Sequence, residues 1–171
     1  MGLASDKVRL SNYSEQWNEL FHKEKVELEN LLGNQVPIIH VGSTSIPQMQ
    51  VAKPVIDIAV GVFDMQQMIE IKKILLDKGY FHNPSAGSDD RLFFAKGNQE
   101  NRLFNIHVEM IGGTSWSNHV DFKRIMSENP EYIVRYCELK KKLAAEFPND
   151  RKKYTQGKAA FIQEVLELKH I

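Results

Sequence analysis

The spacing of apolar and polar residues divides the chain into segments typical of helices and segments typical of strands. Apolar residues recur at helical spacing across residues 14–32, where Ser14 can cap the start of a helix and Gly33 can end it. Residues 36–41 and 54–62 are short apolar runs typical of strands. In chain order the pattern predicts a helix over 14–32, strands over 36–41 and 54–62, and a helix from Asp64 to about Gly79. Strands over 91–95 and 102–111 follow, joined through a turn around Gly97-Asn98. The remainder is predicted to be three helices, one over 117–127, one that begins at Pro130 and one that begins after Asp150.

This order of elements predicts the fold class. Strands that come in pairs, separated and followed by helices, favour a mixed β-sheet with helices packed against it, an α/β protein of the α+β kind. With 171 residues, of which 42% are hydrophobic, the chain is long enough to bury a substantial core. No repeat, low-complexity tract or linker divides it, so we expect one domain over residues 1–171.

Two of the predicted strands have one apolar and one polar or small-residue face, because side chains alternate across a strand. In the strand 54–62 the apolar face consists of Ile56, Ile58, Val60 and Val62, and the opposite face of Val55, Asp57, Ala59 and Gly61. In the strand 102–111 the corresponding sets are Phe104, Ile106, Val108 and Met110, and Asn105, His107 and Glu109.

If these two strands are neighbours in one sheet, Asp57, His107 and Glu109 converge on one surface. Two carboxylates and an imidazole there can hold a divalent ion, and Mg²⁺ is commonly bound by one or two carboxylates together with substrate phosphates. The alternative is that this face is simply exposed to solvent, where polar residues belong.

A glycine-serine turn, Gly42-Ser43-Thr44-Ser45, follows the first predicted strand. Its hydroxyls and backbone N–H groups can cradle phosphate oxygens, and glycine allows a close approach of the backbone. Taken alone, such a turn is better explained by structure than by function. Lys53 and Asp57, which follow it, favour the functional interpretation.

Charge and cysteine content narrow the class of protein. Twenty-two basic residues balance 22 acidic ones, so no overall field attracts nucleic acid or an anionic membrane. Cys137 has no partner for an internal disulfide, and no apolar stretch is long enough to cross a membrane. We therefore expect a cytoplasmic protein whose partners are neither nucleic acids nor membranes.

Two blocks of the sequence closely resemble the signature of the GrpB-like proteins, a family placed in the nucleotidyltransferase superfamily. The blocks are His40-Val41-Gly42-Ser43-Thr44-Ser45-Ile46-Pro47 and Ala52-Lys53-Pro54-Val55-Ile56-Asp57-Ile58. The resemblance covers nearly the whole chain, continuing through Arg91, Phe94, His107, Asn129-Pro130, Tyr136, Phe147, Tyr154, Lys158 and Phe161.

The resemblance implies a nucleotidyltransferase-like mixed sheet flanked by helices, with a C-terminal helical segment. In that superfamily a Gly-Ser loop holds a nucleoside triphosphate, and acids on two strands bind the divalent metal, Mg²⁺ or Mn²⁺, for in-line attack. Carried over, it makes Gly42 and Ser43 the phosphate loop, Asp57 the first metal ligand and Glu109 the third acid. Relatives fused to dephospho-coenzyme A kinase hint at nucleotide or coenzyme A chemistry.

The sequence departs from the superfamily pattern at position 59, where the second acid of the metal-binding pair is replaced by Ala59. A methyl group cannot ligate a metal, so a two-metal site is not expected. His107 is a candidate substitute, although imidazole suits Mn²⁺ or Zn²⁺ better than Mg²⁺.

Several further residues are candidates for binding the nucleotide, each with a structural alternative. Lys53 either pairs with a phosphate or covers a loop, and Arg91 either reaches the pocket or forms a surface ion pair. Tyr154 and Lys158, four apart on one helix face, either close over a nucleotide or pack as core and snorkelling residues. His40 either touches a phosphate or is a hydrogen-bonded structural histidine.

Two hypotheses of function remain. The first is divalent-metal-dependent nucleotide binding, with nucleotidyl transfer to an acceptor that the sequence does not identify. The second is a non-catalytic ligand-binding or partner-binding module that has kept the pocket and lost the chemistry, as Ala59 suggests.

Overall fold

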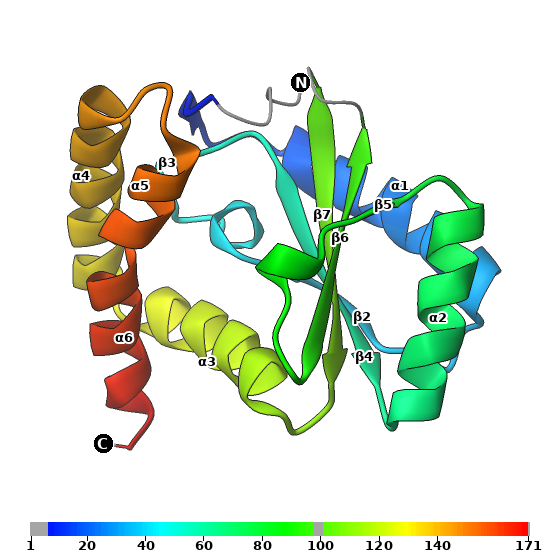
Figure 1. Cartoon of the computed structure of the whole chain (residues 1–171). Helices are drawn as coiled ribbons and strands as arrows, with labels where there is room; N and C mark the ends of the chain where they lie inside the picture. Colours follow the sequence, from blue (N-terminus) through cyan, green and yellow to red (C-terminus); the bar gives the residue numbers. More distant parts are fainter. Residues whose placement is uncertain (1–6, 98–100, 171) are drawn as a thin grey trace.

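A mixed five-stranded sheet forms the centre of the protein in a computed structural model that describes residues 7–97 and 101–170 (Figure 1). In spatial order the strands are β2 (Ile38–Val41), β4 (Ile56–Val62), β7 (Arg102–Met110), β6 (Arg91–Gly97) and β5 (Phe81–His82). β4 and β7 are parallel, and the other neighbours are antiparallel. The strands 54–62 and 102–111 of the sequence analysis are therefore neighbours, as the proposed convergence of side chains required.

Helices lie on both faces of this sheet (Figure 1). On one side are α1 (Gln16–Leu32) and α2 (Met65–Asp77), and on the other is α3 (Thr114–Glu128), with the C-terminal helices on the far side of α3. The C-terminal helices are α4 (Pro130–Glu146), α5 (Arg151–Gly157) and α6 (Ala159–Glu167), followed by the short η3 (Leu168–His170). The fold is thus the predicted nucleotidyltransferase-like mixed sheet with a C-terminal helical segment.

The ends of the first two helices follow from local chemistry. The Asp64 carboxylate accepts a hydrogen bond from the Gln67 backbone N–H at 2.8 Å and caps α2, as predicted. Gly33 ends α1 with a φ of +88°, a conformation that favours glycine. α1 begins at Gln16, whose N–H lies 3.3 Å from the Ser14 hydroxyl.

The two faces of the sheet are both buried, but by different groups. The apolar face of β4 and β7 packs against α1 and α2, and Ile58 and Ile106 have no exposed surface. On the opposite face Asn105, His107 and Glu109 are 7%, 8% and 0% exposed. The alternative that this polar face is simply solvated is therefore wrong. A polar surface buried in this way needs internal partners for its hydrogen-bonding groups.

Several short elements of the structure were not predicted from the sequence. A two-stranded ladder joins β1 (Ser11–Asn12) to β3 (Val51–Ala52), and short 3₁₀ turns form at η1 (Ser43–Ser45) and η2 (Pro84–Ala86). The predicted last helix is broken at Lys158 into α5 and α6. Two residues are too few to show a periodicity, which explains why β1, β3 and β5 were missed.

No helix in the described part of the chain is long and apolar enough to span a membrane. Cys137 is buried against Met49, with the two sulfur atoms 3.6 Å apart, as expected of a structural cysteine. Of the predicted Gly97-Asn98 turn, Asn98 lies outside the described residues, and the single-domain assignment stays a prediction.

Candidate functional site

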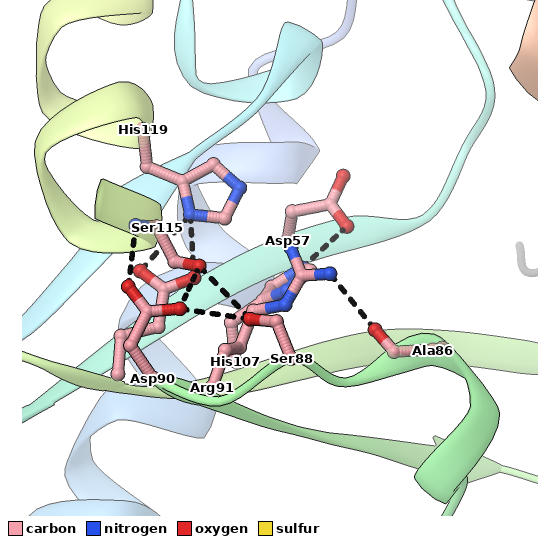
Figure 2. Close-up of polar contacts among 9 residues, drawn as sticks. Asp57, Ala86, Ser88, Asp90, Arg91, His107, Ser115 and His119 are labelled. Atoms are coloured by element: carbon pink, nitrogen blue, oxygen red, sulfur yellow. Dashed lines mark hydrogen bonds and ion pairs between the residues drawn. The ribbon is translucent and has the colours of Figure 1, made fainter. Parts of the chain in front are cut away.

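Asp57 lies at the centre of the polar face because of the register between β4 and β7. In the parallel ladder Asp57 is opposite Asn105, Ala59 is opposite His107 and Gly61 is opposite Glu109. The Asn105 amide donates to Asp57 Oδ1 at 2.7 Å, and His107 Nε2 lies 3.4 Å from the same oxygen. Figure 2 shows the Asp57 and His107 side chains facing each other across the ladder.

The surroundings of Asp57 keep its carboxylate ionised. Burial by itself raises the pKa of Asp57, but hydrogen bonds from His107 and Asn105 and the charge of Lys53 outweigh that effect and hold the pKa far below its usual range. The side chain remains 29% exposed, so the charge is accessible to a ligand from solvent.

The glycine-serine turn packs directly onto this carboxylate. Gly42 follows Val41, which pairs with Asp57 between β2 and β4. Gly42 has a φ of +69°, and a Cβ atom placed on it would lie 2.8 Å from Asp57 Oδ2. Only glycine provides both the conformation and the close approach, so the predicted proximity of turn and carboxylate is present in the structure.

The three hydroxyl groups of the turn point to different partners. The Ser43 hydroxyl is half-buried and lies 3.4 Å from Lys140 Nζ. The Thr44 hydroxyl is buried at 3.0 Å from His40 Nε2, and the Ser45 hydroxyl donates to the Gly42 carbonyl at 2.7 Å. Ser43 is therefore the side chain of the turn that borders the site, whereas Thr44 and Ser45 support the backbone.

His40 has the structural role that was one of its two interpretations. Its ring is buried and stacks on Phe21 with the centroids 4.8 Å apart. Burial, with the nearby charge of Lys123, lowers the pKa of His40 to about 4, so the ring is neutral at physiological pH. A neutral, internally bonded imidazole is not a phosphate ligand.

Two lysines come together over a single aromatic ring. Lys53 Nζ, just before β4, lies 5.1 Å from the centroid of the Tyr154 ring, and Lys158 Nζ lies 4.7 Å from the same centroid. Tyr154 is 1% exposed, so it is a packed residue that positions the two ammonium groups. Burial first, and then mutual repulsion with nearby cations, lowers the pKa of Lys53 well below its usual value.

Two arginines join this group of cations. Arg102, at the start of β7, and Arg151, at the start of α5, both have a pKa lowered by burial and partly restored by the charge of Asp57. Burial lowers the pKa of Lys158 to about 8, again with Asp57 acting in the opposite direction. We call Lys53, Arg102, Arg151 and Lys158 the basic group; the charge of Asp57 raises the pKa of each of them.

Lys140 is a cation that sequence reasoning missed. This α4 side chain is 2% exposed, donates to the Val51 carbonyl and lies over the ring of Tyr136, 4.7 Å from its centroid. Burial lowers its pKa to about 7. Tyr136 also hydrogen-bonds to Ser43, so Lys140 and Tyr136 together fix the Ser43 hydroxyl at the edge of the site.

The remaining two predicted residues lie further along the sheet. Glu109 is four ladder positions beyond the Asp57–Asn105 pair, roughly 13 Å along the strand. Its carboxylate oxygens are 2.9 and 3.0 Å from His119 Nδ1 on α3. Arg91, opposite Glu109 in the ladder, donates through Nη2 to the Ala86 carbonyl at 2.8 Å (Figure 2). The structure thus brings Asp57 and His107 together and places Glu109 with His119.

His119 is a residue that the sequence did not indicate. The helix 117–127 was predicted, but no spacing rule connects a histidine on it to a carboxylate on β7. One ligand atom from each of His107, Glu109 and His119 lies within 4.8 Å of the others. His107 is therefore a member of this cluster and also contacts Asp57.

The candidate site is defined by its charged side chains. Surface hollows of about 330 Å³ and 320 Å³ lie elsewhere, one beside Trp17 and Pro54 and the other beside His40 and Lys123. Neither is lined by Asp57 or by the basic group. We therefore place the candidate site by its side-chain chemistry, on the polar face of β4 and β7.

The mixed sheet with a parallel central pair and its flanking helices are similar to those of a solved polymerase. The Cid1 poly(U) polymerase, solved with MgGTP bound, superimposes with a TM-score of 0.53 and 10% identity, over 78% of this chain and 44% of that chain. At that identity the similarity shows a shared fold alone.

The chain belongs to the GrpB protein family, whose model matches residues 7–168. It is 36% identical over 171 residues to the glutamate-rich protein GrpB of Alkalihalophilus pseudofirmus, covering 97% of this chain and 98% of that protein. It is 33% identical over 162 residues to the UPF0157 protein YqkA of Bacillus subtilis, covering 94% of this chain but only 47% of YqkA. This chain therefore spans about half the length of YqkA.

A solved member of the family has the same architecture. The crystal structure of the conserved protein GrpB from Enterococcus faecalis superimposes with a TM-score of 0.83 and 29% identity, over 94% of this chain and 96% of that one. The resemblance stated from the sequence blocks is confirmed, and with it the fold.

Proposed function

We propose that this protein binds a nucleoside triphosphate, or a related phosphate-bearing small molecule, at the surface formed by Asp57, the Gly42–Ser43 turn and the basic group. The observation on which this depends is the excess of positive charge around a single carboxylate. Four cationic side chains interact electrostatically with Asp57 in a half-buried setting. An anion with several charges is the ligand that such a site favours.

The lowered pKa values of the lysines support the same conclusion. Neighbouring positive charges lower the pKa of both Lys53 and Lys158, in addition to burial, which means that the basic group repels itself. A bound polyphosphate would remove this repulsion. Lysine and arginine are also the side chains that bind phosphate oxygens most strongly, through charge-assisted hydrogen bonds.

The residues around Asp57 suit one divalent metal ion but not two. One Mg²⁺ or Mn²⁺ that arrives with the phosphates fits, because Asp57 supplies the single carboxylate that such an ion needs from the protein. A pair of ions does not fit, since Ala59 is fully buried and carries a methyl group and Asn105, opposite Asp57, carries an amide. We therefore derive no two-metal transfer step. The MgGTP of the Cid1 structure is a precedent for this ligand class on this fold.

The second candidate is a module that binds its ligand without transforming it. Ala59 and Asn105 favour it, because they leave Asp57 without a neighbouring acid on the ladder. Both candidates share the same binding step, so binding is the first property to test.

Thermal unfolding in the presence of ligands tests the proposal. ATP, GTP, CTP, UTP and coenzyme A precursors would be screened with and without Mg²⁺ or Mn²⁺, followed by calorimetric titration of those that raise the melting temperature. A ligand at one hundred times its Kd adds about 2.7 kcal/mol to the free energy of unfolding. No stabilisation by any of these compounds would refute the proposal.

Two pairs of variants locate the binding. Lys158→Met is expected to weaken triphosphate binding by at least tenfold, whereas Lys141→Met, on an exposed part of α4, leaves it unchanged. Asp57→Asn is expected to abolish the metal-dependent part of the affinity, and Asp77→Asn on α2 is its control. Equal effects within either pair would place the ligand elsewhere.

Release of pyrophosphate separates the enzyme from the binding module. The protein would be incubated with each stabilising triphosphate, Mg²⁺ or Mn²⁺, and a mixture of candidate acceptors. Pyrophosphate formation that Asp57→Asn abolishes indicates nucleotidyl transfer. Saturable binding without any pyrophosphate indicates the module.

A further inference from the structure

We infer that His107, Glu109 and His119 form a binding site for one divalent transition-metal ion, separate from the phosphate-binding surface around Asp57. The three residues come from β7 and α3, and one ligand atom of each lies within 4.8 Å of the others. Two imidazoles and one carboxylate are a donor set typical of Zn²⁺ and of other first-row metals, not of Mg²⁺.

The distances within the cluster suit coordination. His119 Nδ1 lies 2.9 and 3.0 Å from the two oxygens of Glu109. Ligand atoms about 2.1 Å from a shared tetrahedral ion are themselves roughly 3.4 Å apart, so an ion requires only a small separation of these two side chains. The rings of His107 and His119 are already in edge contact, with centroids 4.8 Å apart.

Buried polar atoms without partners point to a missing ligand. In the described part of the chain the Nδ1 atom of the 8%-exposed His107 has no hydrogen-bond partner. Glu109 is 0% exposed, and its Oε1 lies 2.9 Å from His119 Nδ1 without a hydrogen bond of suitable geometry. Arg91, which is opposite Glu109 in the ladder, donates to the Ala86 carbonyl. Burying such groups without partners is costly, and a cation would satisfy both at once.

Asp57 would act on this metal only indirectly. It accepts from His107 through Nε2, which leaves Nδ1 of the same ring as the nitrogen available to the metal. A carboxylate that orients a metal-bound histidine in this way is a common supporting contact. Access is open, because the His119 side chain is 24% exposed. The inference does not depend on nucleotide binding.

Titration with Co²⁺ tests this site without any nucleotide. Protein stripped with a chelator would be titrated with Co²⁺ while the visible absorption of the bound ion is followed, and Zn²⁺ would then be added to displace it. We expect one equivalent of Co²⁺ to bind. His119→Gln and Glu109→Gln are each expected to weaken binding by at least tenfold, while His22→Gln, an exposed histidine on α1, leaves it unchanged.

The Co²⁺ titrations test the metal site independently of the proposed function. No stoichiometric Co²⁺ binding by the wild-type protein, or equal binding by His119→Gln, overturns it. His119→Gln is decisive if the buried Glu109→Gln variant does not fold, because His119 is partly exposed. Triphosphate binding without Co²⁺ binding would refute this site alone, and the converse would refute the nucleotide proposal alone.

Discussion

At the scale of single residues, Gly42 brings the backbone of the glycine-serine turn into contact with the Asp57 carboxylate. Its backbone conformation is one that residues with a side chain rarely adopt, and the space where a Cβ would lie is occupied by the Asp57 carboxylate. Gly33 provides a comparison within the same chain. It has a φ of +88°, and a Cβ on it would meet nothing within 4 Å. The two glycines therefore differ in crowding and not in backbone conformation.

The variant Gly42→Ala is expected to be less stable than Gly33→Ala. Both carry a backbone cost of about 1–3 kcal/mol, and Gly42→Ala adds a clash with Asp57 Oδ2. Urea denaturation of the two variants measures the difference in the free energy of unfolding. Equal stability of the two alanine variants would contradict a clash at position 42.

At the scale of elements, the start of α3 depends on a residue far away in the chain. The residue before this helix is Gly113, which has no side chain to cap it. Asp90, which precedes β6, does so instead: it accepts from the Ser115 backbone N–H at 2.8 Å and from the Ser115 hydroxyl at 2.7 Å (Figure 2). These hydrogen bonds lower the pKa of Asp90 to about 2, although burial opposes them. This contact also orients the helix that carries His119.

Asp90→Ala is expected to destabilise the protein by about 1 kcal/mol, the usual cost of losing a helix cap. Asp89→Ala, at the exposed neighbouring position, serves as the control and should be neutral. Chemical denaturation, monitored by circular dichroism, measures the free energy of unfolding of both variants. In the wild-type protein this contribution is complete above the unfolded-state pKa near 4 and is lost as the pH falls through 2. A loss of stability shared equally with Asp89→Ala would exclude a specific cap.

The elements also show how far sequence reasoning reached. Alternation in 54–62 and 102–111 assigned the faces of β4 and β7 correctly, because a strand with one apolar and one polar face leaves a period of two in its sequence. The same rule correctly gave Asp57 and His107 a common face. Strand alternation could not predict the contact of Glu109 with His119 or that of Asp90 with Ser115, because both contacts depend on the angle at which α3 packs on the sheet.

At the scale of the whole molecule, the basic group is assembled from segments far apart in sequence. Lys53 precedes β4, Arg102 begins β7, Arg151 begins α5, and Lys158 lies at the break between α5 and α6. The overall charge of the chain is zero, so composition could not indicate this concentration. Local charge, and not net charge, is what a ligand meets at the surface.

Triphosphate affinity is expected to decrease as the pH rises through 8. The ammonium form of Lys158 binds the anion, and its pKa in the free protein is about 8, so binding above this pH requires uptake of a proton. The affinity should then fall by up to about tenfold per pH unit. Calorimetric titration between pH 7 and 9 measures it.

Lys158→Arg is the control for this pH dependence, because the guanidinium stays charged over the whole range. It should remove the decrease near pH 8 and keep any earlier change that comes from Lys140, whose pKa is about 7. An unchanged slope in Lys158→Arg would assign the titration to another group.

The position of Lys158 in the chain has a consequence for protein synthesis. The ladder that holds Asp57 is complete once β7 has left the ribosome, but Tyr154 and Lys158 are translated only after α3 and α4. A nascent chain can therefore fold its sheet, since folding proceeds from the N-terminal side during synthesis, while half of its cations are still missing. The complete basic group, at which we propose that the anion binds, therefore forms only after the last helices have docked.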